Sequence, residues 1–305
     1  FSYSSQTGFI PLKAKVNQDV YVIVPNFNNI INQWFFACCD GHGVNGHFVS
    51  DFVKQRLPVN IEIAEKLYLK YNRGQDSAAP MEPGNDFKSK ALVDGMLRTN
   101  EELINQSFDT NFSGTTVVSV MLLGNKLWCS NVGDSRAVLA RKTEESWHSI
   151  PLSRDHKPDD ILEKQRIYEC DGRVEPFREA NGDPIGPHRV WLKNENAPGL
   201  AMSRSLGDQV AARVGVIPEP EILNFELTHE DKFIVLASDG VWEFLKNEDV
   251  ISMIIPFWEQ DDPEGACERV IRAATQRWRE EDEIVDDITM IVVFLDSNIF
   301  EQQFQ

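Results

Sequence analysis

Five aspartate positions lie at the ends of apolar segments that are far apart in the sequence. Asp40 follows QWFFACC, Asp239 follows KFIVLAS, and Asp134 lies on the turn after LWCSNVG. Asp19 precedes VYVIV, and the pair Asp286-Asp287 precedes ITMIVVF. Each position alone has an ordinary explanation, because aspartate is common in turns and at helix N-caps. Together they predict one cluster, because strand ends along one edge of a sandwich converge in space.

Carboxylates gathered in this way would repel one another and raise one another's pKa values unless cations lay among them. Hard divalent cations remove the repulsion, and sites built only from oxygen ligands suit Mg²⁺ or Mn²⁺. The sequence contains no HExxH motif and no cluster of His and Cys at zinc spacing. The pattern therefore predicts a centre for Mg²⁺ or Mn²⁺.

An imidazole accompanies the first of these carboxylates. Asp40 is followed by Gly41 and His42, where a strand expected at 34–39 gives way to a helix expected from residue 44 to about 57. A histidine in this place can cap the helix or bond to a backbone group. It can also act as a general acid near neutral pH, because its ordinary pKa is about 6.5. The residues alone leave both roles open.

Strands and helices must position these side chains. Apolar runs predict strands at 19–24, 34–39, 136–141, 222–227, 233–238 and 287–295, and Gly124-Asn125 predicts a hairpin between two more. Helical spacing predicts helices at 44–57, 86–108, 158–171, 247–257 and 263–278. We expect an antiparallel meander over 113–141, a surface loop over 71–85 and an irregular lobe at about 172–207. Helices in two groups beside antiparallel strands favour a layered α+β sandwich.

Size and composition limit the partners. The chain has 305 residues, 42% of them hydrophobic, which is enough for a large core. Its net charge of −18 makes nucleic acid and anionic membranes poor partners. No apolar run reaches the length of a membrane-spanning helix, and five cysteines without a repeating spacing indicate a reducing compartment. The chain begins at Phe1 without an initiator Met, so we expect a domain excised from a longer protein.

The short motifs of the chain, in their order, resemble those of the metal-dependent Ser/Thr protein phosphatases of type 2C (the PPM family). The matching segments are VNQD (16–19), DGHG (40–43), SGTT (113–116), NVGDSRAVL (131–139), DHKP (155–158), RVWL (189–192), GLAMSRSLGD (199–208), SDGVWE (238–243) and DDITMIVV (286–293). They extend over nearly the whole chain. A single DG or GDSR would be weak evidence, whereas the ordered set is very specific.

The resemblance implies a four-layer α/β/β/α sandwich, with two antiparallel sheets flanked by helices on both outer faces. It implies a single catalytic domain over residues 1–305, with a flap-like lobe at about 172–207 beside the cleft. The implied activity is hydrolysis of phosphoserine and phosphothreonine monoesters by direct in-line attack of a water or hydroxide that bridges two metal ions. The implied partners are phosphorylated protein substrates. We expect a monomer in the cytoplasm or nucleus, without nucleic-acid binding or membrane insertion.

The resemblance also implies metal ligands. Asp40 takes the position that bridges two ions, with the carbonyl of Gly41 completing one coordination shell. Further coordination, directly or through water, is implied for Asp19, Asp239 and Asp286. Asp286 is preferred to Asp287 because the family's carboxylate precedes the residue that starts the strand. Asp134 matches a position that helps to hold a third, weaker ion in some members, and His42 matches the family's proposed general acid.

Two positions depart from the family pattern. Gln18 stands where the family often has Glu, so it is a neutral ligand at best. Ala14 stands where a phosphate-binding Arg is expected, five residues before Asp19. Lys13 or Lys15 could replace that Arg toward the substrate phosphate as a point charge, without its two-pronged geometry. Two ordinary surface lysines are an equally good interpretation.

Rival functions find less support. A cysteine-based phosphatase needs an Arg six positions after its Cys, and none of the five cysteines has one. The GxxxxGK[ST] loop of nucleotide-binding enzymes is absent. A pseudophosphatase, or a phosphoprotein-binding scaffold of the same fold, stays open as the alternative. Gln18 is its only support, because Asp40, Asp239 and Asp286 are all present.

Overall fold

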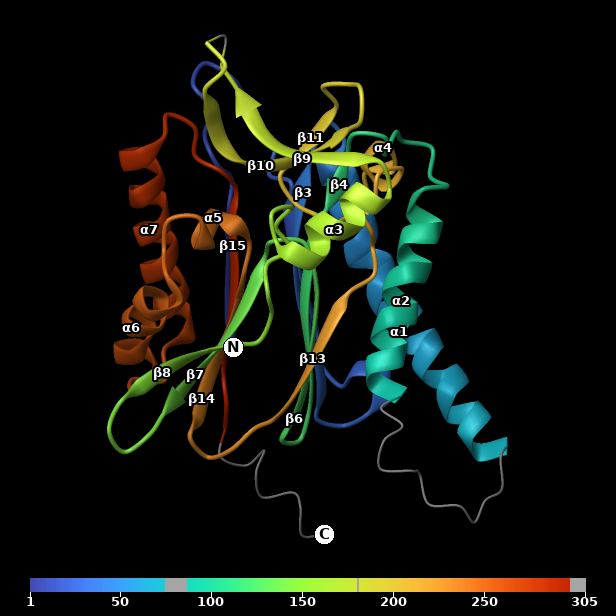
Figure 1. The fold of residues 1–305 in the computed structure, drawn as a ribbon. Helices are drawn as coiled ribbons and strands as arrows, with labels where there is room; N and C mark the ends of the chain where they lie inside the picture. Colours follow the sequence, from blue (N-terminus) through green and yellow to red (C-terminus); the bar gives the residue numbers. More distant parts are fainter. Residues whose placement is uncertain (75–86, 180, 297–305) are drawn as a thin grey trace.

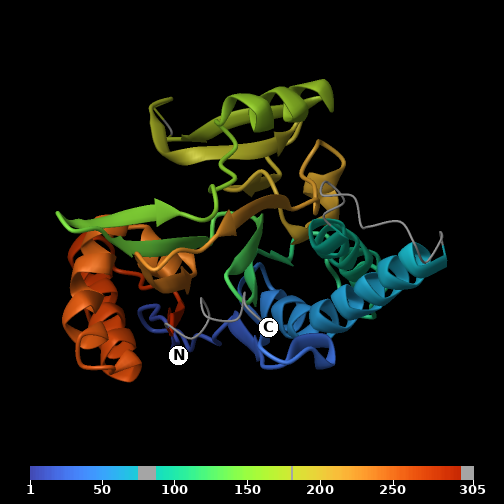
Figure 2. The same cartoon turned by 90° about the horizontal axis from the view of Figure 1, so that it is seen from below.

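The computed structural model describes residues 1–74, 87–179 and 181–296. Two antiparallel sheets pack face to face, and helices cover both outer faces (Figures 1 and 2). The α+β class and the four-layer α/β/β/α sandwich implied by the resemblance are therefore confirmed.

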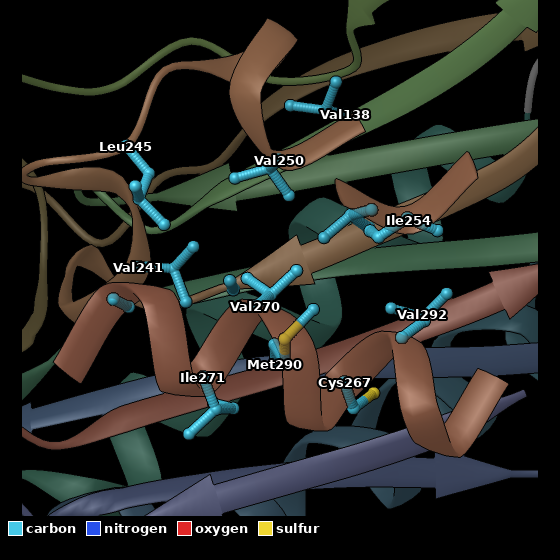
Figure 3. Close-up of a cluster of buried hydrophobic side chains, with 14 of the residues drawn as sticks. Val138, Val241, Leu245, Val250, Ile254, Cys267, Val270, Ile271, Met290 and Val292 are labelled. Atoms are coloured by element: carbon cyan, nitrogen blue, oxygen red, sulfur yellow. The ribbon is translucent and has the colours of Figure 1, made fainter. Parts of the chain in front are cut away.

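The first sheet has five strands in the order β1-β15-β14-β7-β8. Their bounds are Ser2–Gln6 (β1), Ile288–Phe294 (β15), Asp231–Ala237 (β14), Arg136–Lys142 (β7) and Trp147–Pro151 (β8). Its outer face is covered by α6 (Asn247–Trp258) and α7 (Pro263–Glu281). Figure 3 shows this layer, in which Ile254 of α6 and Val270 of α7 pack in one cluster with Val292 of β15.

The second sheet has seven strands in the order β12-β4-β3-β5-β6-β13, with β2 paired to β3. Their bounds are Leu206–Gly207 (β12), Gly114–Thr115 (β4), Gln33–His42 (β3), Val117–Leu123 (β5), Lys126–Val132 (β6), Glu221–Glu226 (β13) and Asp19–Val24 (β2). Its outer face is covered by α1 (Gly46–Gly74) and α2 (Phe87–Leu103).

The central strands are apolar on both faces, which explains why they read as continuous hydrophobic runs. In β3, Phe36 points between the sheets, whereas Phe35 points toward α1 and α2. In β14, Ile234 points between the sheets and Phe233 toward α6 and α7. Successive side chains of a strand alternate between faces, so a strand in the middle of four layers is mostly apolar on both faces. The buried polar pair Ser119 and Ser130 is satisfied by a hydrogen bond of 2.6 Å between the two hydroxyls.

The hairpin predicted at Gly124-Asn125 joins β5 to β6, and Gly124 has the positive φ of 56° that such a turn requires. The meander expected over 113–141 is wrong. Instead of pairing with β6, β7 crosses to the other sheet and pairs with β14 and β8. Local pattern shows where strands occur but not which sheet each one joins. The crossover runs through Gly133-Asp134 and so carries Asp134 from one sheet to the other.

The lobe expected to be irregular is a sheet of its own. Strands β9 (Gly172–Arg178), β10 (Pro184–Leu192) and β11 (Pro198–Leu200) pair antiparallel. The sheet packs on α3 (Ile161–Glu169) and α4 (Gln209–Ala212) through a small apolar cluster. The expectation of irregular structure was wrong because proline is tolerated at the first residue of a strand and at bulges. Pro184 is the first residue of β10, and the register shifts between Ile185 and Arg189.

The predicted helices are present with shifted bounds. The first runs from Gly46 to Gly74 and so takes in residues 71–74 of the predicted loop, while residues 75–85 of that loop lie outside the described residues. In the described part of the chain, no helix combines the length and the apolar character needed to cross a membrane.

Packing between the sheets gives a first prediction. Ile291 of β15 is fully buried there, so Ile291→Ala should lower the free energy of unfolding by about 2–5 kcal/mol through the cavity it leaves. Ile161, with 82% of its surface exposed, offers the matched control Ile161→Ala, which should cost far less. Urea unfolding measures both variants, and equal losses of stability would contradict the packing described here.

Candidate metal and catalytic site

The predicted carboxylates meet at one end of the sandwich, the upper end in Figure 1. Asp19 and Asp40 lie opposite one another in the register of β2 and β3. Asp239 begins α5 (Asp239–Trp242) directly after β14, and Asp286 lies just before β15, the neighbour of β14. Asp40 interacts electrostatically with Asp19, Asp239 and Asp286, and Asp239 interacts with Asp134. The structure therefore brings together all five positions that the sequence singled out.

The cluster concentrates negative charge in a buried place. Burial raises the pKa of Asp40 well above its ordinary value, and the charges of Asp19 and Asp239 raise it further. Burial likewise raises the pKa of Asp239, with Asp134 and Asp286 adding to the rise. For Asp19, burial raises the pKa to about 7, although the Ser238 hydroxyl donates to Oδ2 at 2.8 Å and opposes the shift. Such a cluster is stabilised by added positive charge.

Several oxygen atoms of the cluster suit a cation. Oδ1 of Asp19, Asp134 and Asp239 is buried and accepts no hydrogen bond from the described residues, which is costly for a carboxylate. Among those residues, no three His, Cys, Asp or Glu side chains form a group that could hold a metal ion. Mg²⁺ usually keeps several waters and binds through one or two carboxylates. The all-oxygen donor set therefore fits partly hydrated Mg²⁺ or Mn²⁺ better than an ion caged by protein alone.

The backbone at Gly41 leaves no room for a side chain. A Cβ there would lie 2.5 Å from the Gly46 carbonyl oxygen and 2.6 Å from that of Gln18. Gln18 also supports this turn, because its carbonyl accepts from the Gly41 N–H at 3.2 Å and its Nε2 donates to the Gly43 carbonyl at 2.8 Å. The residue that replaces the family's Glu thus holds the backbone beside Asp40.

Asp286 and its neighbour Asp287 differ in their surroundings. Asp287 is buried, and its two carboxylate oxygens accept the backbone N–H of Gly8 at 2.7 Å and of Gln18 at 2.9 Å. The Asp286 side chain is 44% exposed. Asp287 is therefore committed to holding the chain, and Asp286 is the more available ligand of the pair.

The two lysines considered for phosphate binding also differ. Lys15 Nζ lies 2.7 Å from Asp286 Oδ1 and 2.9 Å from Asp287 Oδ1, so its ammonium is engaged by carboxylates. Lys13 is exposed to solvent. A third lysine, Lys157 of the DHKP motif, was not predicted as part of the site. Its Nζ donates to Asp134 Oδ2 at 2.6 Å, which neutralises part of the charge at the sheet crossover.

His42 forms a pair with an aspartate that the residue patterns did not single out. Its Nε2 lies 2.6 Å from Asp208 Oδ2, across 166 residues of sequence. Burial lowers the pKa of His42, but the charge and hydrogen bond of Asp208 outweigh it, so the pKa is raised above its ordinary value. The other ring nitrogen, Nδ1, is buried and has no partner among the described residues. The only sequence signal for Asp208 was its place at the end of GLAMSRSLGD.

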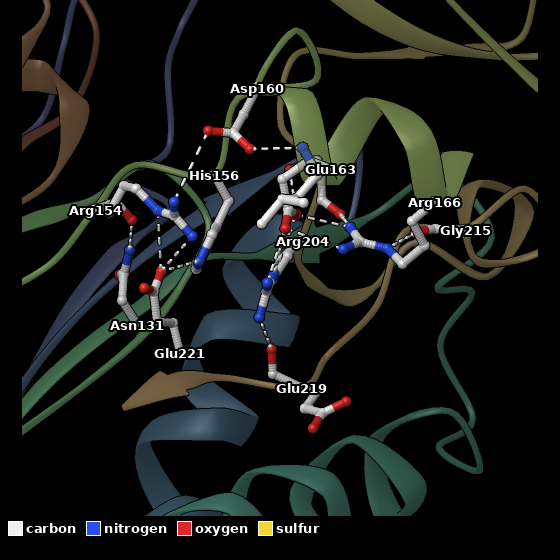
Figure 4. Close-up of polar contacts among 12 residues, drawn as sticks. Asn131, Arg154, His156, Asp160, Glu163, Arg166, Arg204, Gly215, Glu219 and Glu221 are labelled. Atoms are coloured by element: carbon white, nitrogen blue, oxygen red, sulfur yellow. Dashed lines mark hydrogen bonds and ion pairs between the residues drawn. The ribbon is translucent and has the colours of Figure 1, made fainter. Parts of the chain in front are cut away.

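A buried ionic network supports the segment that carries Asp208 (Figure 4). Glu163 of α3 accepts hydrogen bonds at 2.7 Å from Arg166, Arg204 and Ser203. Arg204 also donates to the Glu219 carbonyl at 2.9 Å. These contacts join α3 to residues 203–204, immediately before β12 and Asp208. The partner of His42 is therefore placed by α3 as well as by the central sheet.

Figure 4 also shows His156, which supports the turn at Asp134. Its Nδ1 accepts the Gly133 N–H at 3.1 Å, and its Nε2 lies 3.3 Å from Glu221 Oε2. Both ring nitrogens are engaged, so this histidine has a structural role.

Comparisons with known proteins identify related sequences. The family model described as "Protein phosphatase 2C" matches residues 15–282. "Probable protein phosphatase 2C 35" of Arabidopsis thaliana is 35% identical over 308 residues, covering 96% of this chain and 83% of the relative. "Probable protein phosphatase 2C 72" of the same plant is 40% identical over 261 residues, covering 84% and 75%.

A solved structure is similar over almost the full length. The serine-threonine phosphatase 2C from Toxoplasma gondii superposes with a TM-score of 0.80, covering 97% of this chain and 94% of that one. The two sequences are 19% identical, so this likeness shows a shared fold.

The network at Glu163 predicts a pH-dependent loss of stability. Burial raises the pKa of Glu163, but its hydrogen bonds to Arg166 and Arg204 lower it more, so the net pKa lies below the ordinary value. Its ionised form therefore stabilises the fold above the unfolded-state pKa of about 4.3, and this stabilisation is lost as the pH falls below it. Glu163→Gln should cost about 3 kcal/mol at neutral pH, because it takes the carboxylate away from two partly buried guanidinium groups.

Urea unfolding between neutral and acid pH, with a chelator present, measures this loss. The gap between Glu163→Gln and wild type should narrow as the pH falls. Exposed Glu169 on the same helix gives the control Glu169→Gln, which should stay close to wild type throughout. A gap that is constant with pH would show that the charge of Glu163 does not stabilise this segment.

Proposed function

The chain belongs to the protein phosphatase 2C family, and from this premise we propose how its residues hydrolyse phosphoserine and phosphothreonine esters of protein substrates. One observation carries the proposal: carboxylates from remote strands converge in a buried cluster, and several of their oxygen atoms accept no hydrogen bond from the residues that the structure describes. A scaffold that only bound phosphoproteins would have no use for such concentrated negative charge, which repels a phosphate group.

The metal-binding part of the proposal follows from the donor set. Asp40 and the Gly41 carbonyl would hold a pair of Mg²⁺ or Mn²⁺ ions, with Asp19, Asp239 and Asp286 adding ligands directly or through water. Asp134 would serve a third, weaker ion. When bound, divalent ions neutralise phosphoryl oxygens and lower the pKa of the attacking water. The raised pKa values of Asp40 and Asp239 support this assignment, because bound cations would relieve the repulsion that raises them.

His42 is assigned the proton that the leaving group needs. The alkoxide of serine or threonine is strongly basic, so a proton donor assists its departure. Asp208 favours the protonated imidazole and bonds to Nε2, which leaves Nδ1–H as the ring donor that has no partner in the described part of the chain. Asp208 then acts as a positioning residue that holds the ring through its other nitrogen.

We base the proposals on domain organisation, oligomeric state, compartment and partners on the composition of the chain and on where its elements lie in the fold. Residues 1–305 act as one monomeric catalytic domain in the cytoplasm or nucleus, and the β9–β11 sheet is the flap beside the cleft. A net charge of −18 supports proteins rather than nucleic acid as partners. With Lys15 held by carboxylates, Lys13 is the freer candidate for contact with the substrate phosphate.

Metal-dependent turnover tests the proposal directly. Hydrolysis of a phosphoserine peptide should require added Mn²⁺ or Mg²⁺, and Asp239→Asn should reduce it on the order of 100-fold by removing one ligand charge. Asp261→Asn, at an exposed loop position, is the matched control and should keep wild-type turnover. Turnover in chelator, or full activity of Asp239→Asn, would refute the proposal. Peptide binding without hydrolysis by wild type would favour the scaffold alternative.

The choice of leaving group tests the role of His42. His42→Ala should slow hydrolysis of a phosphoserine peptide by about 10²–10⁴-fold, the range expected for loss of a general acid. It should slow p-nitrophenyl phosphate much less, because that leaving group departs readily without a proton. Exposed His148 on β8 supplies the control His148→Ala. Equal losses on both substrates would assign His42 another role.

A further inference from the structure

Lys15 places a positive charge at the margin of the aspartate cluster, beside Asp286 and Asp287. Its Nζ contacts Asp286 Oδ1 at 2.7 Å and Asp287 Oδ1 at 2.9 Å, and only 14% of its side chain is exposed. We propose that Lys15 is a tethered counter-cation that competes with a divalent ion for Asp286 and thereby weakens ion binding. The inference rests on the proposed function, because it takes Asp286 as a metal ligand.

The segment around Lys15 is fixed on both sides, so the contact is part of the fold. The backbone N–H groups of Gly8 and Gln18 both donate to Asp287. The Asn17 side chain adds two bonds, accepting the Asp19 N–H at 3.0 Å and donating to Ser5 Oγ at 3.0 Å. Gly8 passes so close to the Asp286 backbone that a Cβ there would lie 2.5 Å from the carbonyl oxygen. These contacts hold Lys15 beside Asp286 and Asp287.

The charge of Lys15 reaches the rest of the cluster through Asp286. Asp286 interacts electrostatically with Asp19, Asp40 and Asp239. A cation on Asp286 therefore lowers the negative potential felt by any ion bound nearby. At separations of a few ångströms, a unit charge changes the affinity of a divalent ion by an order of magnitude or more. Screening by solvent reduces this change in affinity.

Two other roles for Lys15 make different predictions. A phosphate anchor would have to leave both carboxylates, and its loss would change substrate binding while leaving ion affinity alone. A purely structural link between residues 8–19 and β15 would, when removed, loosen Asp286 and weaken ion binding. Only competition predicts that removing the lysine strengthens ion binding.

The experiment is a Mn²⁺ titration of the full chain by isothermal titration calorimetry, after removal of ions and without substrate. Lys15→Gln removes the charge yet keeps a side chain that can donate to Asp286. It should bind Mn²⁺ about tenfold more tightly than wild type. Lys126→Gln changes the net charge equally at an exposed position beside the Gly124-Asn125 hairpin, and should stay within about twofold of wild type. Lys15→Arg keeps the charge and should resemble wild type.

Thermal unfolding in chelator checks that each variant is folded, and Lys15→Met replaces Lys15→Gln if the latter is not. Unchanged or weaker Mn²⁺ binding in the neutral variant overturns the inference. If wild type binds Mn²⁺ and Asp239→Asn weakens that binding, while Lys15→Gln matches wild type, only the role of Lys15 is wrong. If wild type binds no Mn²⁺, the proposed function falls with it.

Discussion

Repulsion among buried carboxylates is the constraint around which this structure is organised. Asp19 and Asp40 are paired across β2 and β3, while Asp239 and Asp286 adjoin β14 and β15. Each is joined directly to a strand whose packing extends far from the site. The packing of the apolar layers between and outside the sheets therefore offsets the repulsion. Packing that is distributed over two cores can hold like charges together where local contacts could not.

Positive charge from the protein reaches only the margins of the cluster. Lys15 pairs with Asp286 and Asp287 on one side, and Lys157 pairs with Asp134 on the other. In the described part of the chain, no lysine, arginine or histidine forms an ion pair with Asp19, Asp40 or Asp239. The fold thus supplies lysines to Asp134, Asp286 and Asp287, whereas Asp19, Asp40 and Asp239 have no ion-pair partner among the described residues. That distribution is the one expected of a site completed by cations from solution.

The sequence predicted the features that local residue patterns determine. Strand ends, the Gly124-Asn125 hairpin and the alternation of buried faces all follow from residues close in the chain. It failed where the answer depends on distant partners. Nothing near residues 136–142 says that β7 pairs with β14, because both sheets need equally apolar strands. The Lys15 and Asp208 contacts cross 271 and 166 residues, and each residue type has many ordinary surface uses. The strand-end pattern and the order of the family motifs identified the carboxylates, whereas the contacts of Lys15 and Asp208 became visible only in the structure.

The two parts of the proposed chemistry are held by different structures. The metal-ligand candidates belong to the strands and strand ends of the two sheets, whereas the partner of His42 follows residues 203–204, which α3 fixes through Glu163. The β9–β11 sheet packs on α3 and α4, so its position is coupled to Asp208 more directly than to Asp40. Asp40 and His42 are separated by a single residue, yet Asp40 lies opposite Asp19 of β2 whereas His42 pairs with Asp208 after β12.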